Sequence, residues 1–159
     1  MSSDAAQEIL VRGAHALAHA DPLGSRLEIL LTVITEQLDV ESAAIVMPDP
    51  SSDHLGIVAS IGLGEPAVGG LTEALRDPRH PIARTLADRI STFDVLPTRP
   101  GGPALRSHLP LIVTRAGSDR VLGVVALAHQ RPLDADARHL LEAAADLVAV
   151  ALETEGSTG

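Results

Sequence analysis

Apolar residues recur at helical spacing in three stretches of the chain. They predict a first helix over residues 1–19, a second over 25–39 and a last one over 134–153. The second stretch opens with Ser25 and Glu28, three places apart, which is the spacing of a capping box. In the last stretch the apolar positions cover more than one stripe, so we expect this helix to contact more than one neighbour.

The middle of the chain changes to short apolar runs of the β type. "SAAIVM" (42–47) and "LGIVASI" (55–61) are separated by turn-forming residues and predict a hairpin. A second hairpin is predicted over 105–114 and 121–129, joined by "RAGSD", and a short strand over 91–95. Both alternation classes of 121–129 are apolar, so we expect this strand in the middle of a sheet that is covered on two faces.

Glycine and proline mark the connections between these elements. "GLGEPAVGG" (62–70) predicts a mobile surface loop, followed by a short helix over 71–76. "LPTRPGGP" (96–103) predicts a second loop. Between the two, residues 80–90 predict a helix, and Pro81 suits its first position.

The length and the element order favour one α+β domain, since a chain of 159 residues is long enough to bury a core. We divide it into an N-terminal helix (1–22), a folded domain (23–155) and a disordered tail, "GSTG" (156–159). Asp134 is expected to cap the last helix.

The composition narrows the classes of function. With one Phe, no Tyr and no Trp, the core must be aliphatic, and a site built on aromatic stacking is disfavoured. The formal net charge is −9 and the Arg residues form no cluster, so we expect no nucleic-acid or membrane-surface partner. The absence of cysteine excludes disulfides, thiolate nucleophiles and Cys-ligated zinc. No apolar run reaches the roughly 18 residues of a membrane span, so we expect a cytoplasmic protein.

The stretch "RSHLPLIV" carries the first candidate site residues. Arg106 and His108 fall on the same face of the predicted strand, about 7 Å apart. They are suited to clamp an anionic ligand, since Arg offers a charged fork and His a tunable donor. The alternative is that both lie near the open end of the strand and contact water or the acidic surface of the protein. His80, before Pro81, is a third candidate, with a role at the start of the helix as its alternative.

Several stretches, in this order, resemble a GAF domain, the small sensory module of bacterial and plant signalling proteins. The resemblance covers roughly residues 25–153. The stretches that carry it are "IVASIGL" (57–63), "HPIARTLAD" (80–88), "RSHLPLIV" (106–113), "VLGVVALAH" (121–129) and "RHLLEAAADLVAVALE" (138–153).

The resemblance implies a three-layer α/β/α sandwich with a central antiparallel sheet of five or six strands. The N- and C-terminal helices would pack on one face, and loops and short helices would roof a small-molecule pocket on the other. Thr92 and Asp94 would then lie beside the pocket, either as polar ligand contacts or as turn caps. Pro110 is structural in this interpretation, because a strand proline belongs at a bulge or an edge.

The residues exclude several activities of GAF proteins. Bilin attachment and the reduction of free methionine sulfoxide both use cysteine, and the cyclic-nucleotide motif N-K-F-D-E needs a lysine, which the chain also lacks. We expect no haem, since a haem pocket is usually helped by aromatic packing. His15 and His19 share a helix face, yet with no third ligand evident we interpret them as exposed polar residues and expect no metal.

We therefore expect a non-enzymatic sensory or regulatory GAF module that binds a small molecule non-covalently. It would signal through its terminal helices to a partner, either a separate signalling protein or another part of a longer chain. The apolar stripes of these helices predict a homodimer through residues 4–19 and 136–153. One alternative is a degenerate GAF domain that serves only dimerisation or scaffolding, and another is an enzyme of unrecognised type that uses His108.

Overall fold

The computed structural model of the chain describes residues 7, 9–11, 23–49, 51–96 and 105–158. Residues 7 and 9–11 are helical, and the rest of the first predicted helix lies outside the described residues. The other elements follow in the order α2 (Leu23–Leu38), β1 (Val40–Pro48), β2 (Leu55–Ile61), α3 (Glu65–Ala74), α4 (Pro81–Asp88), β3 (Thr92–Val95), β4 (Leu105–Arg115), β5 (Ser118–His129) and α5 (Ala135–Thr158).

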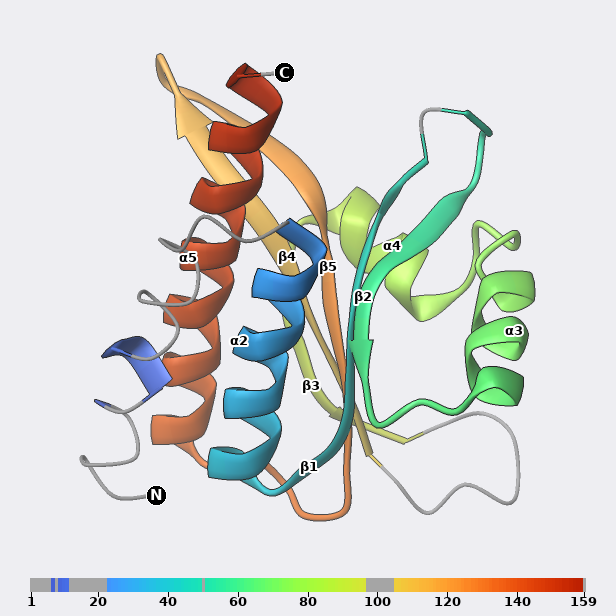
Figure 1. Cartoon of the computed structure of the whole chain (residues 1–159), viewed down its shortest axis with the longest axis vertical. Helices are drawn as coiled ribbons and strands as arrows, with labels where there is room; N and C mark the ends of the chain where they lie inside the picture. Colours follow the sequence, from blue (N-terminus) through green and yellow to red (C-terminus); the bar gives the residue numbers. More distant parts are fainter. Residues whose placement is uncertain (1–6, 8, 12–22, 50, 97–104, 159) are drawn as a thin grey trace.

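The strands form one five-stranded sheet in the order β2-β1-β5-β4-β3, and every neighbouring pair is antiparallel. β5 is the central strand, as its two apolar faces predict. Helices α2 and α5 cover one face of the sheet and α3 and α4 the other (Figure 1). The predicted α/β/α sandwich with an antiparallel sheet is therefore confirmed.

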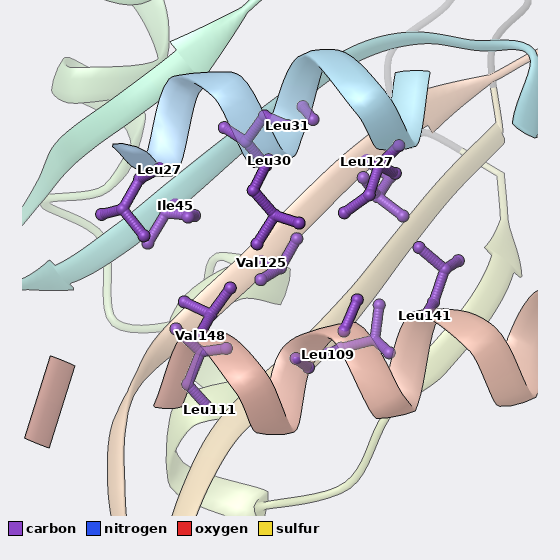
Figure 2. Packing of buried hydrophobic residues seen from close by; sticks show 14 of the residues in the cluster. Leu27, Leu30, Leu31, Ile45, Leu109, Leu111, Val125, Leu127, Leu141 and Val148 are labelled. Carbon is purple, nitrogen blue, oxygen red and sulfur yellow. The ribbon is translucent and has the colours of Figure 1, made fainter. Parts of the chain in front are cut away.

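The main hydrophobic core lies between the sheet and the pair α2 and α5. Figure 2 shows Leu30 of α2 and Val148 of α5 converging on Val125 of the central strand. Ile9, from the short N-terminal helical segment, is 1% exposed and joins the same core. The side chains are aliphatic throughout, apart from Phe93, which packs at the margin.

The boundaries of the two long helices differ from the prediction. α2 begins at Leu23, so Ser25 lies inside the helix and the capping box is wrong. Within this first part of the helix Arg26 and Leu27 are buried, whereas Ser25 is exposed. Asp134 does cap α5, because its carboxylate accepts from the backbone N–H of Ala137 at 2.8 Å.

α5 continues past the predicted end at 153 and includes residues 156–158, which we expected in a tail. A single helical glycine costs only about 1 kcal/mol relative to alanine, which a long packed helix tolerates. Within the described ranges, none of the helices combines the length and the apolar character needed to cross a membrane.

The segment predicted as a loop over 62–70 contains a helix instead. α3 spans Glu65–Ala74 with a proline in its first turn, and it replaces the short helix expected over 71–76. The Gly and Pro content of the segment suggests a loop, yet among its glycines only Gly62 has a positive φ, at +81°. A Cβ at this position would clash with the Glu41 carbonyl oxygen. Nothing in α3 is buried, so this helix is only lightly anchored.

Candidate functional site

The face of the sheet below α3 and α4 carries small side chains where the other face carries large ones. The register aligns Ser60, Ala44, Ala126 and His108 in one row across four strands. A second row places Ser42 beside Ala128 on the same face. We call the five small residues of these rows the small-residue floor: Ser42, Ala44, Ser60, Ala126 and Ala128.

The small-residue floor is not fully covered by protein. Ala126 and Ala128 are only partly buried, although they belong to the central strand. On the opposite face of the same strand, Val125 and Leu127 are 4% and 1% exposed. The central strand is therefore sealed by large side chains on one face and is less completely covered at Ala126 and Ala128 on the other.

His108 stands at the edge of the small-residue floor and is itself buried, at 4% exposed. Burial, with smaller contributions from the charges of His80 and Arg106, lowers its pKa from 6.5 to about 4. The imidazole is therefore neutral at pH 7, with its Nδ1 atom 3.4 Å from the Thr92 hydroxyl oxygen. The alternative in which His108 contacts water at an open strand end is wrong. Arg106, its neighbour on the same face, is partly buried.

His80 lies at the start of α4, above this face of the sheet. Its Nδ1 atom accepts from the backbone N–H of Ile82 at 3.1 Å, so it caps the helix. This confirms the role that we gave as the alternative to ligand binding. Burial lowers the pKa of His80, while the charge of Asp77 opposes the shift. Because Nδ1 is an acceptor, the neutral ring carries its proton on Nε2.

Four of the five predicted site residues thus gather on one side of the sheet: Thr92, Arg106 and His108 from two neighbouring strands, and His80 from the helix above them. They form a polar wall beside an apolar floor. A neutral imidazole and a guanidinium offer hydrogen-bond donors and one positive charge in a chain that is acidic as a whole. This combination is suited to a small ligand with an anionic or carbonyl group and a short aliphatic body.

Asp94, the fifth predicted residue, points to the other face. Its φ of 57° places it at an irregularity of β3, between the paired residues Thr92 and Val95. The Asp94 carboxylate accepts from the backbone N–H of Leu133 at 2.9 Å and from the guanidinium of Arg138 at 2.6 Å. It therefore caps the turn before α5, which is the turn-cap alternative of the sequence analysis.

A buried pair that the sequence analysis did not identify adjoins Asp94. The Ser107 hydroxyl lies 2.8 Å from Nε2 of His129, and it accepts from the backbone N–H of Asp94 at 3.1 Å. Nδ1 of His129 lies 2.7 Å from the Arg131 carbonyl oxygen. Nδ1 must therefore donate to that carbonyl, and Ser107 donates to Nε2.

The pair has a structural role rather than a catalytic one. Ser107 and His129 are 0% and 1% exposed, so no substrate reaches the hydroxyl. The sequence contained one signal for this pair, because Ser107 occupies the aliphatic alternation class of its strand. A buried hydroxyl in such a position needs a hydrogen-bond partner.

The family model that describes a GAF domain matches residues 23–154. The chain belongs to the GAF family. A comparison with curated proteins found no match. Among the described residues of this GAF domain, no group of three or more His, Cys, Asp or Glu is placed to hold a metal ion.

Solved structures share the fold. The GAF domain of a phosphoenolpyruvate-protein phosphotransferase from Coxiella burnetii has a TM-score of 0.81 at 14% identity, over 100% of this chain and 99% of that one. The free methionine-R-sulfoxide reductase from Neisseria meningitidis, in complex with its substrate, has a TM-score of 0.74 at 15% identity, over 100% and 96%. Residues 122 to 287 of a methyl-accepting chemotaxis protein have a TM-score of 0.62 at 17% identity, over 89% and 95%. At these identities the likeness shows the fold alone.

Proposed function

We propose that this GAF domain is a non-enzymatic sensory or regulatory module that binds a small molecule over the small-residue floor. One observation carries the proposal: the central strand of the sheet is sealed on the α2 and α5 face but leaves Ala126 and Ala128 partly exposed on the other. The polar wall of Arg106 and His108 beside these alanines supplies the groups that orient a ligand.

The ligand is held without covalent chemistry or stacking. The chain has no cysteine, and its single aromatic side chain, Phe93, packs against the core on the other face. Affinity then comes from aliphatic contact with the small-residue floor and from charge-assisted hydrogen bonds to Arg106. We infer a small carboxylate or a comparable anion with a short apolar body.

The signal leaves through α5. Alternation along β4 places Arg106 and His108 on the ligand face and Ser107, between them, on the helix face. Ser107 bonds the backbone of Asp94, and Asp94 holds the N-terminal turn of α5 through Leu133. A ligand that draws Arg106 toward itself therefore displaces the residues that hold the start of α5. The occurrence of this fold in a methyl-accepting chemotaxis protein supports a sensory role.

A thermal-shift screen of small carboxylic, amino and keto acids tests the proposal. A ligand at a hundredfold excess over its Kd adds about 2.7 kcal/mol to the free energy of unfolding. We expect Arg106→Gln to abolish the shift, and Ala126→Leu to abolish it by filling the space above the floor. Arg120→Gln, at an exposed arginine on the neighbouring strand, is the matched control and should keep the shift. A screen with no stabilising compound at millimolar concentration argues against the proposal.

The second candidate function is dimerisation or scaffolding alone. It is favoured by Val150 of α5, which is 61% exposed, and by Leu147 on the same helix, which is only partly buried. Both lie within the predicted interface over 136–153, whereas most of the other half, residues 4–19, lies outside the described residues. Sedimentation equilibrium should give a dimer at tens of micromolar. Val150→Glu should give a monomer without damage to the core, and a monomeric wild-type chain would contradict this candidate.

A further inference from the structure

Among the described residues, no strand pairs with the outer edge of β4 along most of its length. β3 pairs with it only around Thr92, opposite His108, and Val95, opposite Arg106. β4 continues to Arg115, and among the described residues no strand lies beside 109–115 on that side. Apart from Pro110, which has no N–H to donate, the backbone N–H and C=O groups of such an edge are a template for another strand.

A groove with a volume of about 460 Å³ follows this open edge. It runs between the segment that leaves α4 and the outer side of α5, with Leu109 and Pro110 of β4 in its lining. The groove is separate from the small-residue floor, which lies farther along the sheet, on β1, β2 and β5.

The two walls of the groove differ in chemistry. On the α5 side stand Glu142 and Asp146, two exposed carboxylates one helical turn apart. Like charges at this spacing destabilise a helix, and no described residue forms an ion pair with either of them. On the opposite side stand Ile112 and Ile90, and Ile90 is 65% exposed. Arg89 also lines this side, and its guanidinium donates to the Asp119 carbonyl oxygen at 3.4 Å. One wall therefore attracts cations and the other attracts apolar side chains.

We propose that this groove binds an extended segment of a partner protein in which basic and apolar residues alternate, added as a strand to the edge of β4. Successive side chains of a strand point to opposite faces of the sheet. Every second residue of the added segment would therefore face Glu142 and Asp146, and the residues between them would face Ile90 and Ile112. Backbone hydrogen bonds to the edge supply affinity, and the two walls determine which sequences of the partner segment bind.

A second copy of this chain fits the groove less well. Antiparallel pairing of two β4 edges needs a two-fold axis perpendicular to the sheet, which places both α5 helices on the same face. Glu142 and Asp146 of the two copies would then face one another. The net charge of −9 on each copy adds to this repulsion.

The test uses the full chain and an acetylated six-residue peptide in which arginine and valine alternate. A second peptide, with three arginines followed by three valines, has the same charge and composition but cannot match the two walls. We expect the alternating peptide to bind at low salt and to shift the backbone amide resonances of residues 109 and 111–115, since Pro110 has no amide proton. The block peptide should bind at least about fivefold more weakly.

Charge variants distinguish binding in the groove from general electrostatic attraction of a basic peptide to an acidic protein. Glu142→Gln with Asp146→Asn should weaken the alternating peptide about fivefold. The matched control, Glu28→Gln with Glu36→Gln, makes the same change of net charge at exposed positions of α2 and should change the affinity less than about twofold.

Three results would overturn the proposal. The first is equal weakening by both double variants, and the second is equal affinity for the two peptides. The third is a concentration-dependent shift of the 109–115 resonances without any peptide, which would assign the edge to a second copy of the chain.

Discussion

The two faces of the sheet are made by the same strands and yet are packed in opposite ways. On the α2 and α5 face, β5 presents Val125 and Leu127 to a large aliphatic core. On the α3 and α4 face it presents Val124 and two alanines, and the buried cluster there has four members: Val46, Leu75, Ile82 and Val124. One face supplies most of the burial that stabilises the domain, whereas the other is less tightly packed, as the proposed binding of a ligand requires.

Hydrogen bonds connect the two faces at β3 and β4. Ser107, on the helix side, directly precedes His108 on the other side, and its hydroxyl accepts from the backbone N–H of Asp94, two residues after Thr92. Adjacent residues of a strand share a backbone, so a displacement on one face is felt on the other. Coupling between the two faces is therefore expected at β3 and β4, rather than through the core.

The largest effect that the comparison predicts is on stability. Leu30→Ala, at 0% exposed under α2, should lower the free energy of unfolding by about 2–5 kcal/mol. Leu71→Ala on α3, where the side chain is only partly buried, should cost about 1 kcal/mol or less. Urea denaturation of the two variants measures the difference. Equal losses would show that the α3 and α4 face is packed as tightly as the other.

The pH dependence of stability tests the burial of His108. Its pKa is about 4 in the folded chain and near 6.5 in the unfolded one, so between these values the unfolded chain binds more protons. The stabilisation is therefore complete above pH 6.5 and is lost as the pH falls toward 4, by about 3 kcal/mol at most.

The variant His108→Gln should remove this loss, because glutamine does not titrate. His139→Gln, at an exposed position, controls for the removal of a histidine from the unfolded chain and should keep it. NMR titration of the ring protons reads the pKa of His108 directly. A pKa near 6.5 would mean that His108 contacts water and that the α3 and α4 face of the sheet is open to solvent at this position.

A smaller loss of stability is predicted for variants of Asp94, which connects β3 with the start of α5. Asp94→Ala removes the acceptor for the Leu133 N–H and the partner of Arg138, and should cost about 1–3 kcal/mol. Asp94→Asn keeps an acceptor and tolerates the positive φ, so it should cost less. Hydrogen exchange at the first turn of α5 should rise more in the alanine variant. If the two variants behave alike, the charge of Asp94 rather than its capping bond holds the helix.

The sequence predicted the sheet better than its surroundings. Alternation is a local signal, and the two apolar faces of 121–129 were enough to place β5 at the centre. α3 is missed because Gly69 and Gly70 lower the helix propensity of the segment, whereas Pro66 stands in the first turn, where a proline is compatible with a helix.

The candidate site was predictable only in part. The pairing of Arg106 with His108 on one strand face follows from the period of two, and the register then adds Thr92. The burial of His108 does not follow, since it depends on α4 lying above the strand. Ser107 and His129 are 22 residues apart and meet only because β4 and β5 are neighbours, so no local pattern reveals their bond.

The smallest effect concerns α3 itself. Gly69 and Gly70 lie inside this helix, and a Cβ at either position would meet no atom within 4 Å. Gly69→Ala and Gly70→Ala should therefore each add about 0.5–1 kcal/mol to the stability of the helix, because alanine restricts the unfolded chain without a clash. Hydrogen exchange across α3 measures this gain. Gly117→Ala is the control, since a φ of +78° there makes alanine unfavourable.

The glycine variants also test whether the low stability of α3 helps a ligand to enter. If the ligand enters by displacing this lightly anchored helix, the variant with both Gly69→Ala and Gly70→Ala should bind the ligand more slowly. Its contacts with the bound ligand should be unchanged. Stopped-flow measurements with a compound from the screen separate the two rates. Unchanged association would mean that the ligand reaches the small-residue floor past α4 or the end of β3, and that the weakness of α3 reflects its sequence alone.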